Sequence, residues 1–265
     1  MKTNVRRWLP AVVQNRTNSA LLGMAALALI GAAVAAPAAT AGRTSTISAE
    51  AAADNIAAAT GQKPASPDAQ TAAADQAAAA AKAAADKETA ILAAAPVAAN
   101  LQTDVQLQPN YFYCGPAATR IALTAHGVAP TQDQVAQALG TTTSGTNSAF
   151  DITRVLNQAL GAGRYQTTEI AGQRATPQQM DKLQRDIVLA INQGDPVVAN
   201  IAGTMQDTAG EVHSYEGGHY LTVIGYADQG RTAVIGDPAD AVGSPVYQLS
   251  TIDLANWIAS RGYSS

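Results

Sequence analysis

The sequence contains a single cysteine, Cys114, at the start of the run CGPAA, and His219 and Asp237 follow it far downstream. Because there is no second cysteine, the thiol has no partner for an intramolecular disulfide. A lone cysteine ahead of a helix, with a histidine and then an aspartate later in the chain, is typical of a nucleophilic triad. The competing interpretation is a buried cysteine that acts only as a small apolar side chain.

The residues after Cys114 favour the nucleophile. Pro116 has no backbone N–H, so a helix tolerates it only in the first turn. Cys114 is therefore predicted at a helix N-terminus, where unpaired N–H groups and the helix dipole stabilise a thiolate and lower the pKa of the thiol.

His219 opens an apolar run that alternates like a β-strand, which puts His219 and Leu221 on one face. A hairpin centred on Asp228, with three or five loop residues, would bring Asp237 directly opposite His219 on that face. A shift of one residue would place them on opposite faces. The pattern also allows a core histidine, and for Asp237 a turn that ends the strand.

Residues 203–217 are rich in glycine and include His213 and Glu216. They predict a long loop before His219 that covers the substrate. Gly217 and Gly218 leave the backbone uncovered, which favours close approach of a substrate.

Gln108 lies six residues before Cys114. A side-chain amide there could donate to an oxyanion, with the backbone N–H of Cys114 as the second donor, although by itself it is also typical of an exposed loop residue. Metal binding is the competing chemistry for cysteine and histidine. Cys114, His213 and His219 fit no common zinc pattern, so neither a metal nor a cofactor is expected.

The elements that would position these residues divide into helices first and strands later. Helices are predicted at about 114–126, 131–139, 149–160 and 176–193 and around Trp257, and strands at about 165–170, 197–201, 219–226, 232–235 and 246–249. This order predicts an α+β domain over residues 101–265, with N-terminal helices packed on a C-terminal antiparallel sheet.

The first 41 residues combine a basic start, an uncharged apolar run and the small-residue site Ala39–Ala41. This pattern predicts a signal peptide at 1–41 and a secreted protein, with an uncleaved membrane anchor as the alternative. Residues 42–100 are alanine-rich and bury too little apolar area for a core, so a stalk or linker that is partly helical is expected there.

The charge balance constrains the partners. The chain has 16 Lys and Arg against 20 Asp and Glu, and four of the basic residues lie in 1–41. The remaining chain therefore carries a formal charge of −8, which argues against nucleic acid or an anionic membrane surface as partners.

Four sequence features together resemble one peptidase family. The set Gln108, Cys114-Gly115-Pro116, Gly218-His219-Tyr220 and Gly236-Asp237-Pro238-Ala239 is similar to the papain-like peptidases of the bacteriocin-processing (double-glycine) family and their free-standing relatives. The resemblance covers roughly residues 104–260 and also takes in Thr131-Gln132 and Gly194-Asp195-Pro196-Val197.

The resemblance implies a papain-like fold and a cysteine peptidase. Gln108 would help form the oxyanion hole, and Cys114, His219 and Asp237 would form the triad that hydrolyses a peptide or amide bond of a peptide or cell-wall substrate. Two alternatives remain open: an inactive module that binds peptide or cell-wall polymer, and a cell-wall amidase or transpeptidase.

Overall fold

The computed structural model describes residues 67–239 and 243–265. The predicted signal peptide and residues 42–66 of the alanine-rich stretch lie outside the described residues. Residues Ala79–Ser265 form one compact unit, separate from the residues up to Ala78. None of the helices within the described ranges has the length and apolar character needed to cross a membrane.

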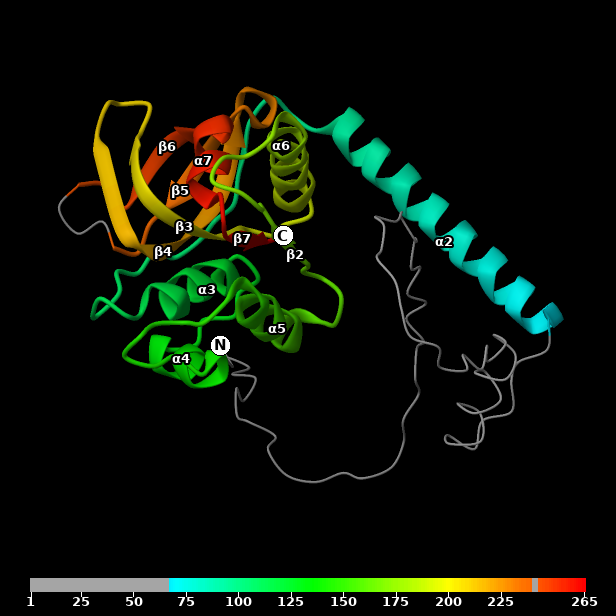
Figure 1. The fold of residues 1–265 in the computed structure, drawn as a ribbon, viewed down its shortest axis with the longest axis horizontal. Helices are drawn as coiled ribbons and strands as arrows, with labels where there is room; N and C mark the ends of the chain where they lie inside the picture. Colours follow the sequence, from blue (N-terminus) through cyan, green and yellow to red (C-terminus); the bar gives the residue numbers. More distant parts are fainter. Residues whose placement is uncertain (1–66, 240–242) are drawn as a thin grey trace, which may run out of the picture. The chain divides into compact units, whose positions relative to one another are not determined.

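The compact unit is built from helices and one antiparallel sheet, which confirms the predicted α+β class (Figure 1). The described helices are α2 (Pro67–Ala94), which belongs to this unit from Ala79 onward, α3 (Cys114–Thr124), α4 (Gln132–Leu139), α5 (Ala149–Leu160), α6 (Pro177–Asn192) and α7 (Thr251–Ile258), with a short 3₁₀ turn η1 (Asp228–Gly230). The strands are β1 (Ala99–Asn100), β2 (Thr167–Glu169), β3 (Val197–Gln206), β4 (Val212–Ala227), β5 (Thr232–Gly236), β6 (Val246–Ser250) and β7 (Gly262–Ser264). The sheet order is β2-β7-β3-β4-β5-β6, and β1 pairs with β4.

Local sequence signals fix the helix ends as predicted. Thr131 caps α4 through a capping box with Gln134, and Thr176 caps α6 in the same way with Gln179. In each box the threonine hydroxyl accepts from the backbone N–H of the glutamine, and the glutamine side chain accepts from the threonine N–H, so two unpaired donors are satisfied.

The two faces of the sheet are covered by different helices. One face packs against α6 and α7 in a core that includes Leu221, Val223 and Trp257. The other face packs against α3, where Ile121 contacts Ile224 and Val234 in a smaller cluster. In Figure 1, α3, α4 and α5 lie together on one side and α6 and α7 on the other.

The compact unit begins before the predicted residue 101. Leu92 and Ala95 pack against the main core, and β1 pairs with Gly225 and Tyr226 of β4. The ladder between β3 and β4 ends at Val197 and Val223, so the next residues of β4 have free backbone groups on that edge. The segment Ala99–Leu101 takes up this edge, and Leu101 N–H donates to the Ile224 carbonyl at 2.8 Å.

The predicted substrate-covering loop at 203–217 is wrong. These residues continue β3 and β4 as a long hairpin, with Gly203 paired to Tyr215 and Gln206 to Val212. The turn at 207–211 and residues 216–218 of β4, at the register shift, are left outside the ladder. The glycines that suggested a loop serve the hairpin: Gly203 has φ +91° at the irregularity after Ile201.

Candidate active site

Cys114 is the first residue of α3, as predicted, and its side chain is 8% exposed. The N-terminal residues of a helix have backbone N–H groups without partners inside the helix. The N–H groups of Gly115 and of Tyr220 in β4 hydrogen-bond the sulfur. Gly115 is needed at this position, because a Cβ there would lie 2.2 Å from Thr146 Oγ1.

His219 lies in β4 with its imidazole between Cys114 and Asp237. Its Nε2 is 2.7 Å from Asp237 Oδ1, and its side chain also hydrogen-bonds the Cys114 thiol. Because Nε2 is taken by Asp237, the contact with the thiol falls to Nδ1. His219 is 3% exposed and Asp237 is completely buried, so this chain of three groups is shielded from water.

The environment favours a thiolate beside a protonated imidazole. Burial raises the pKa of the Cys114 thiol, but the hydrogen bond and charge of His219, together with the N–H groups of Tyr220 and Gly115, outweigh it, so the thiol pKa lies below its usual value. Burial also lowers the pKa of His219, and the contacts with Asp237 and Cys114 overcome this and raise it to about 9. Burial raises the pKa of Asp237, yet His219 and backbone N–H donation hold it below normal.

Asp237 reaches His219 diagonally, which corrects the predicted position directly opposite. The ladder of β4 and β5 pairs Thr222 with Gly236, so Asp237 falls opposite Leu221 if the register continues. Leu221 and His219 share a face because they are two residues apart. The predicted shared face is therefore correct, and the predicted pair is shifted by two residues.

Three donors besides His219 hold the Asp237 carboxylate. Tyr215 and Tyr247 donate their hydroxyl protons to Oδ2 at 3.1 and 2.9 Å, and the N–H of Ala239 donates to Oδ1 at 2.9 Å. A carboxylate that accepts several hydrogen bonds is stabilised in its charged form and held in one orientation. Neither tyrosine was predicted as a site residue; the available signal was the position of Tyr247 in the predicted strand 246–249.

Tyr215 also covers His219. The two rings stack with centroids 4.1 Å apart and planes 22° from parallel. Residues four apart along a regular strand are about 13 Å apart, so the stack requires a distorted strand. β4 provides this distortion, because Tyr215 pairs with Gly203 and His219 pairs with Ile201. Four steps along β4 therefore correspond to only two steps along β3. The extra residues of β4 end in Gly218, whose φ of +95° suits glycine.

Gln108 lies near Asp237, at the opposite end of the triad from Cys114 in its backbone contacts. Its backbone N–H donates to the Pro238 carbonyl at 2.8 Å, which places it next to Asp237 in space. Its Nε2 donates to the Asn110 carbonyl at 2.7 Å. Gln132, which is buried, donates to the Leu107 carbonyl at 2.9 Å and so fixes the segment from the side of α4.

The described residues that come nearest to a metal-ligand set lie elsewhere, at the tip of the β3–β4 hairpin. One ligand atom from each of Asp207, Glu211 and His213 lies within 4.8 Å of the others. Asp207 Oδ1 already accepts from the N–H groups of Ala209 and Glu211, as expected for a side chain that closes a tight turn. Cys114 and His219 do not belong to this group.

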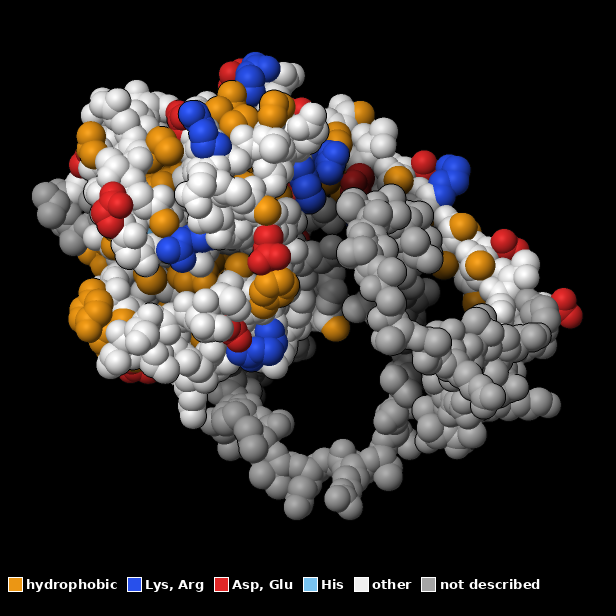
Figure 2. All heavy atoms as spheres, in the orientation of Figure 1, with side chains coloured by type: hydrophobic (Ala, Val, Ile, Leu, Met, Phe, Trp, Pro, Cys, Tyr) orange, Lys and Arg blue, Asp and Glu red, His pale blue; other side chains and the backbone are white. Residues whose placement is uncertain are grey.

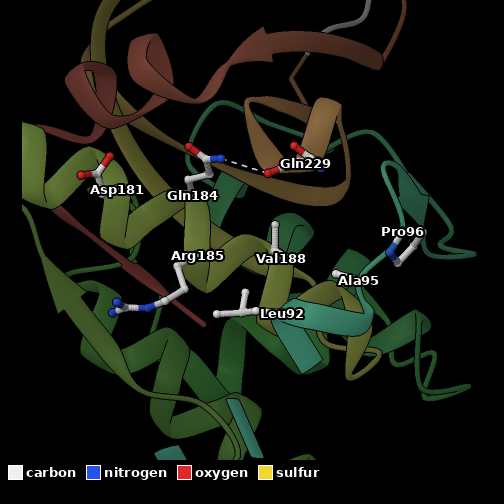
Figure 3. A pocket seen from close by; sticks show the side chains of 8 residues that line it. All are labelled: Leu92, Ala95, Pro96, Asp181, Gln184, Arg185, Val188 and Gln229. Carbon is white, nitrogen blue, oxygen red and sulfur yellow. Dashed lines mark hydrogen bonds between the residues drawn. The ribbon is translucent and has the colours of Figure 1, made fainter. Parts of the chain in front are cut away.

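A cavity of about 410 Å³ lies away from these residues (Figure 3). Its lining residues are Leu92, Ala95, Pro96, Asp181, Gln184, Arg185, Val188 and Gln229. Gln184 Nε2 donates to the Gln229 carbonyl at 2.9 Å on one side of it. None of the candidate catalytic residues lines this cavity. The candidate active site is therefore placed at Cys114, where the reactive side chains meet, and not at the cavity.

Comparison with known proteins identifies the family. A model described as the Peptidase_C39 like family matches residues 96–265. The chain belongs to this family. The predicted resemblance is thereby confirmed, and the α+β arrangement, with a cysteine starting a helix beside a histidine of an antiparallel sheet, is the papain-like fold that it implied. No curated protein matches the chain.

Three solved structures are similar to this Peptidase_C39-like chain. A double-glycine motif protease from an AMS/PCAT transporter, in complex with the leader peptide, has 13% identity and a TM-score of 0.39, covering 63% of this chain and 91% of that one. The peptidase domain of Streptococcus ComA, a bi-functional ABC transporter involved in quorum sensing, has 20% identity, a TM-score of 0.38 and coverages of 60% and 94%. Xylellain, a cysteine protease from Xylella fastidiosa, has 11% identity, a TM-score of 0.38 and coverages of 66% and 87%.

Proposed function

We propose that this protein is a secreted cysteine peptidase that hydrolyses a peptide or amide bond. Cys114 would be the nucleophile, His219 the general base and acid, and Asp237 the group that orients His219. The observation that carries this proposal is the buried hydrogen-bonded chain in which His219 contacts the Cys114 thiol and lies 2.7 Å from Asp237. A group that only fills space needs no such chain.

The proposed reaction has two stages. The Cys114 thiolate attacks the carbonyl carbon, a C–S bond forms, and the carbonyl electron pair moves to the oxygen. The Cys114 N–H and the Gln108 amide donate to this oxyanion. The C–N bond then breaks as His219 gives its proton to the leaving amine. In the second stage His219 takes a proton from water, the resulting hydroxide attacks the thioester, and the acid product leaves the thiolate behind.

The substrate we propose is a peptide or a cell-wall peptide, and no cofactor takes part. Membership of the Peptidase_C39-like family supports a peptide substrate. On the face in Figure 2, the coloured Lys and Arg side chains occur in small groups with acidic ones near several of them, not as one extended basic patch. Export rests on the sequence pattern of residues 1–41.

The test is the reactivity of Cys114 followed by a search for cleavage. Purified protein should react with iodoacetamide rapidly at neutral pH, and His219→Ala should slow this reaction and move it to alkaline pH. Slow labelling that is the same in both proteins would contradict the triad. Incubation with a peptide library and with peptidoglycan fragments, read by mass spectrometry and controlled with Cys114→Ala, then separates peptidase from amidase or transpeptidase action. A reactive thiol without any product would favour the binding module.

A further inference from the structure

Arg261 carries a half-buried guanidinium that pairs with none of the acidic residues in the described parts of the chain. Its Nη1 donates to Asn200 Oδ1 at the long distance of 3.5 Å, and its Nε is buried without a hydrogen-bond partner within the described parts of the chain. The ion pairs found in residues 67–239 and 243–265 use other cations. A partly buried charge is seldom left without a partner, because unmade hydrogen bonds to charged groups are costly.

The backbone holds Arg261 firmly at the end of α7. Its N–H donates to the Ile258 carbonyl, and its carbonyl accepts from the Ile170 N–H, both at 2.8 Å. Ser260 before it has φ +67°, an uncommon conformation for a residue with a side chain. This fixed turn directs the guanidinium against Gly218, where a Cβ would lie 2.8 Å from Nη2. The charge therefore sits beside the residue that precedes His219.

Tyr220 links this charge to the nucleophile. Its N–H hydrogen-bonds the Cys114 sulfur, and the residue is 4% exposed. Its buried hydroxyl makes no hydrogen bond of good geometry within the described residues, although the Asn200 side chain lies near enough to lower its pKa. Asn200 is its cross-strand partner in β3, so both side chains lie on the same face. Burial raises the pKa of Tyr220, the charge of Cys114 adds to this rise and that of Arg261 opposes it. The phenol is thus a proton donor at neutral pH within electrostatic reach of both.

The acidic group that acts on Tyr220 is already engaged. Asp151 at the start of α5 contributes to the raised pKa of Tyr220. Its carboxylate accepts from the Ser148 hydroxyl at 3.1 Å and pairs with Arg154 at 3.3 Å. The positive charge of Arg261 is therefore available to an incoming group.

We infer that Arg261, Asn200 and Tyr220 form a subsite for a carboxylate of the substrate beside Cys114. The planar guanidinium matches a carboxylate through two parallel hydrogen bonds, and the tyrosine hydroxyl and asparagine amide supply further donors. The inference rests on the proposed function, since the substrate bound here is the one that Cys114 attacks. The carboxylate is either the C-terminus of a peptide or an acidic side chain next to the scissile bond.

Two alkylating agents of nearly equal size test the subsite without a known substrate. Iodoacetate and iodoacetamide both give up iodide to the Cys114 thiolate, but only iodoacetate carries a carboxylate. We expect Arg261→Gln to lower the ratio of the iodoacetate rate to the iodoacetamide rate about fivefold or more. Arg231→Gln removes an equal charge from the exposed turn after β4, where Arg231 pairs with Asp228, and should leave the ratio unchanged. An unchanged ratio in Arg261→Gln, confirmed as folded by circular dichroism, would overturn the subsite.

Failure of the subsite can be told from failure of the triad. Slow iodoacetamide labelling of the unaltered protein would contradict the thiolate itself, whereas rapid labelling with a ratio independent of Arg261 contradicts only the subsite. If Arg261→Gln does not fold, Tyr220→Phe replaces it and should lower the same ratio, and an unchanged ratio counts against the subsite.

Protection of the unaltered protein from iodoacetamide tests the subsite again and identifies the source of the carboxylate. N-acetylglycine is compared with N-acetylglycinamide, and N-acetylglutamate α-amide with N-acetylglutamine α-amide. Stronger protection by N-acetylglycine than by its amide supports a C-terminal carboxylate. Stronger protection by N-acetylglutamate α-amide than by N-acetylglutamine α-amide supports an acidic side chain. Equal protection by acid and amide in both pairs would overturn the inference.

Discussion

The phenol ring of Tyr215 stacks on the imidazole of His219 and donates its hydroxyl proton to Asp237, the partner of that imidazole. One side chain thus covers the hydrogen bond between His219 and Asp237 and also fixes one of its ends. A hydrogen bond between charged groups is stronger when water is kept away from it.

Replacing Tyr215 should alter the pH range in which the protein cleaves a peptide. Tyr215→Ala admits water to the buried pair and weakens the contact with Asp237 that raises the pKa of His219. The pKa of His219 should therefore fall, which moves the alkaline limit of peptide cleavage down by roughly half to one pH unit. Tyr247→Phe is the matched control, because it removes a donor from the same Asp237 oxygen while its ring stacks on His213 instead. Equal shifts in the two variants would show that the stack has no separate effect.

The protonation states of Cys114 and His219 predict a bell-shaped pH dependence of peptide cleavage. The thiolate is present above the lowered pKa of Cys114, and the imidazolium that protonates the leaving amine is lost as the pH rises through about 9. In His219→Ala burial is no longer offset, so the thiol pKa should rise and labelling at pH 7 should fall about tenfold or more. Peptide cleavage measured between pH 5 and 10 would reveal both limbs, whereas stopped-flow iodoacetamide labelling reports the acid limb alone. A labelling profile centred on the usual thiol pKa in the unaltered protein would contradict the ion pair.

Much of the fold followed from local sequence signals. The helix starts predicted near residues 114, 131 and 176 are confirmed, because helix starts depend on side chains a few residues away. The strand β7 and the extension of β3 and β4 were missed. Their pairing depends on distant segments, which no local pattern specifies.

The face of Asp237 shows why register could not be predicted. The turn after Ala227 leaves four residues before Thr232, and that count alone would put Asp237 opposite Thr222, on the other face from His219. Ile224 is an extra residue in β4, and this bulge changes the register by one. Asp237 therefore lies on the face of His219 because an even-numbered loop and a bulge compensate each other.

The two glycines before His219 should respond in opposite ways to substitution. Gly218→Ala introduces a side chain at φ +95° and a Cβ 2.8 Å from the Arg261 guanidinium, so it should cost about 1–3 kcal/mol of folding free energy and disturb the stack of Tyr215 on His219. Gly217→Ala meets no atom within 4 Å and should be tolerated. Thermal unfolding and iodoacetamide labelling of both variants provide the comparison. A tolerated Gly218→Ala would argue that the stack of Tyr215 on His219 does not depend on the bulge.

Gln108 separates attack on a carbonyl from simple thiol reactivity. Its backbone is fixed to Pro238 beside Asp237, and its segment is held by Gln132, so the amide is positioned before any substrate arrives. Gln108→Ala should lower the rate of peptide cleavage by about 10²–10³-fold, the usual cost of an oxyanion donor. Iodoacetamide labelling forms no oxyanion and should change far less. Gln132→Leu, which releases the Leu107 carbonyl, should reproduce part of the cleavage defect. Cleavage and labelling that fall equally in Gln108→Ala would instead mean that the residue supports the Cys114 thiolate, and the oxyanion role would be withdrawn.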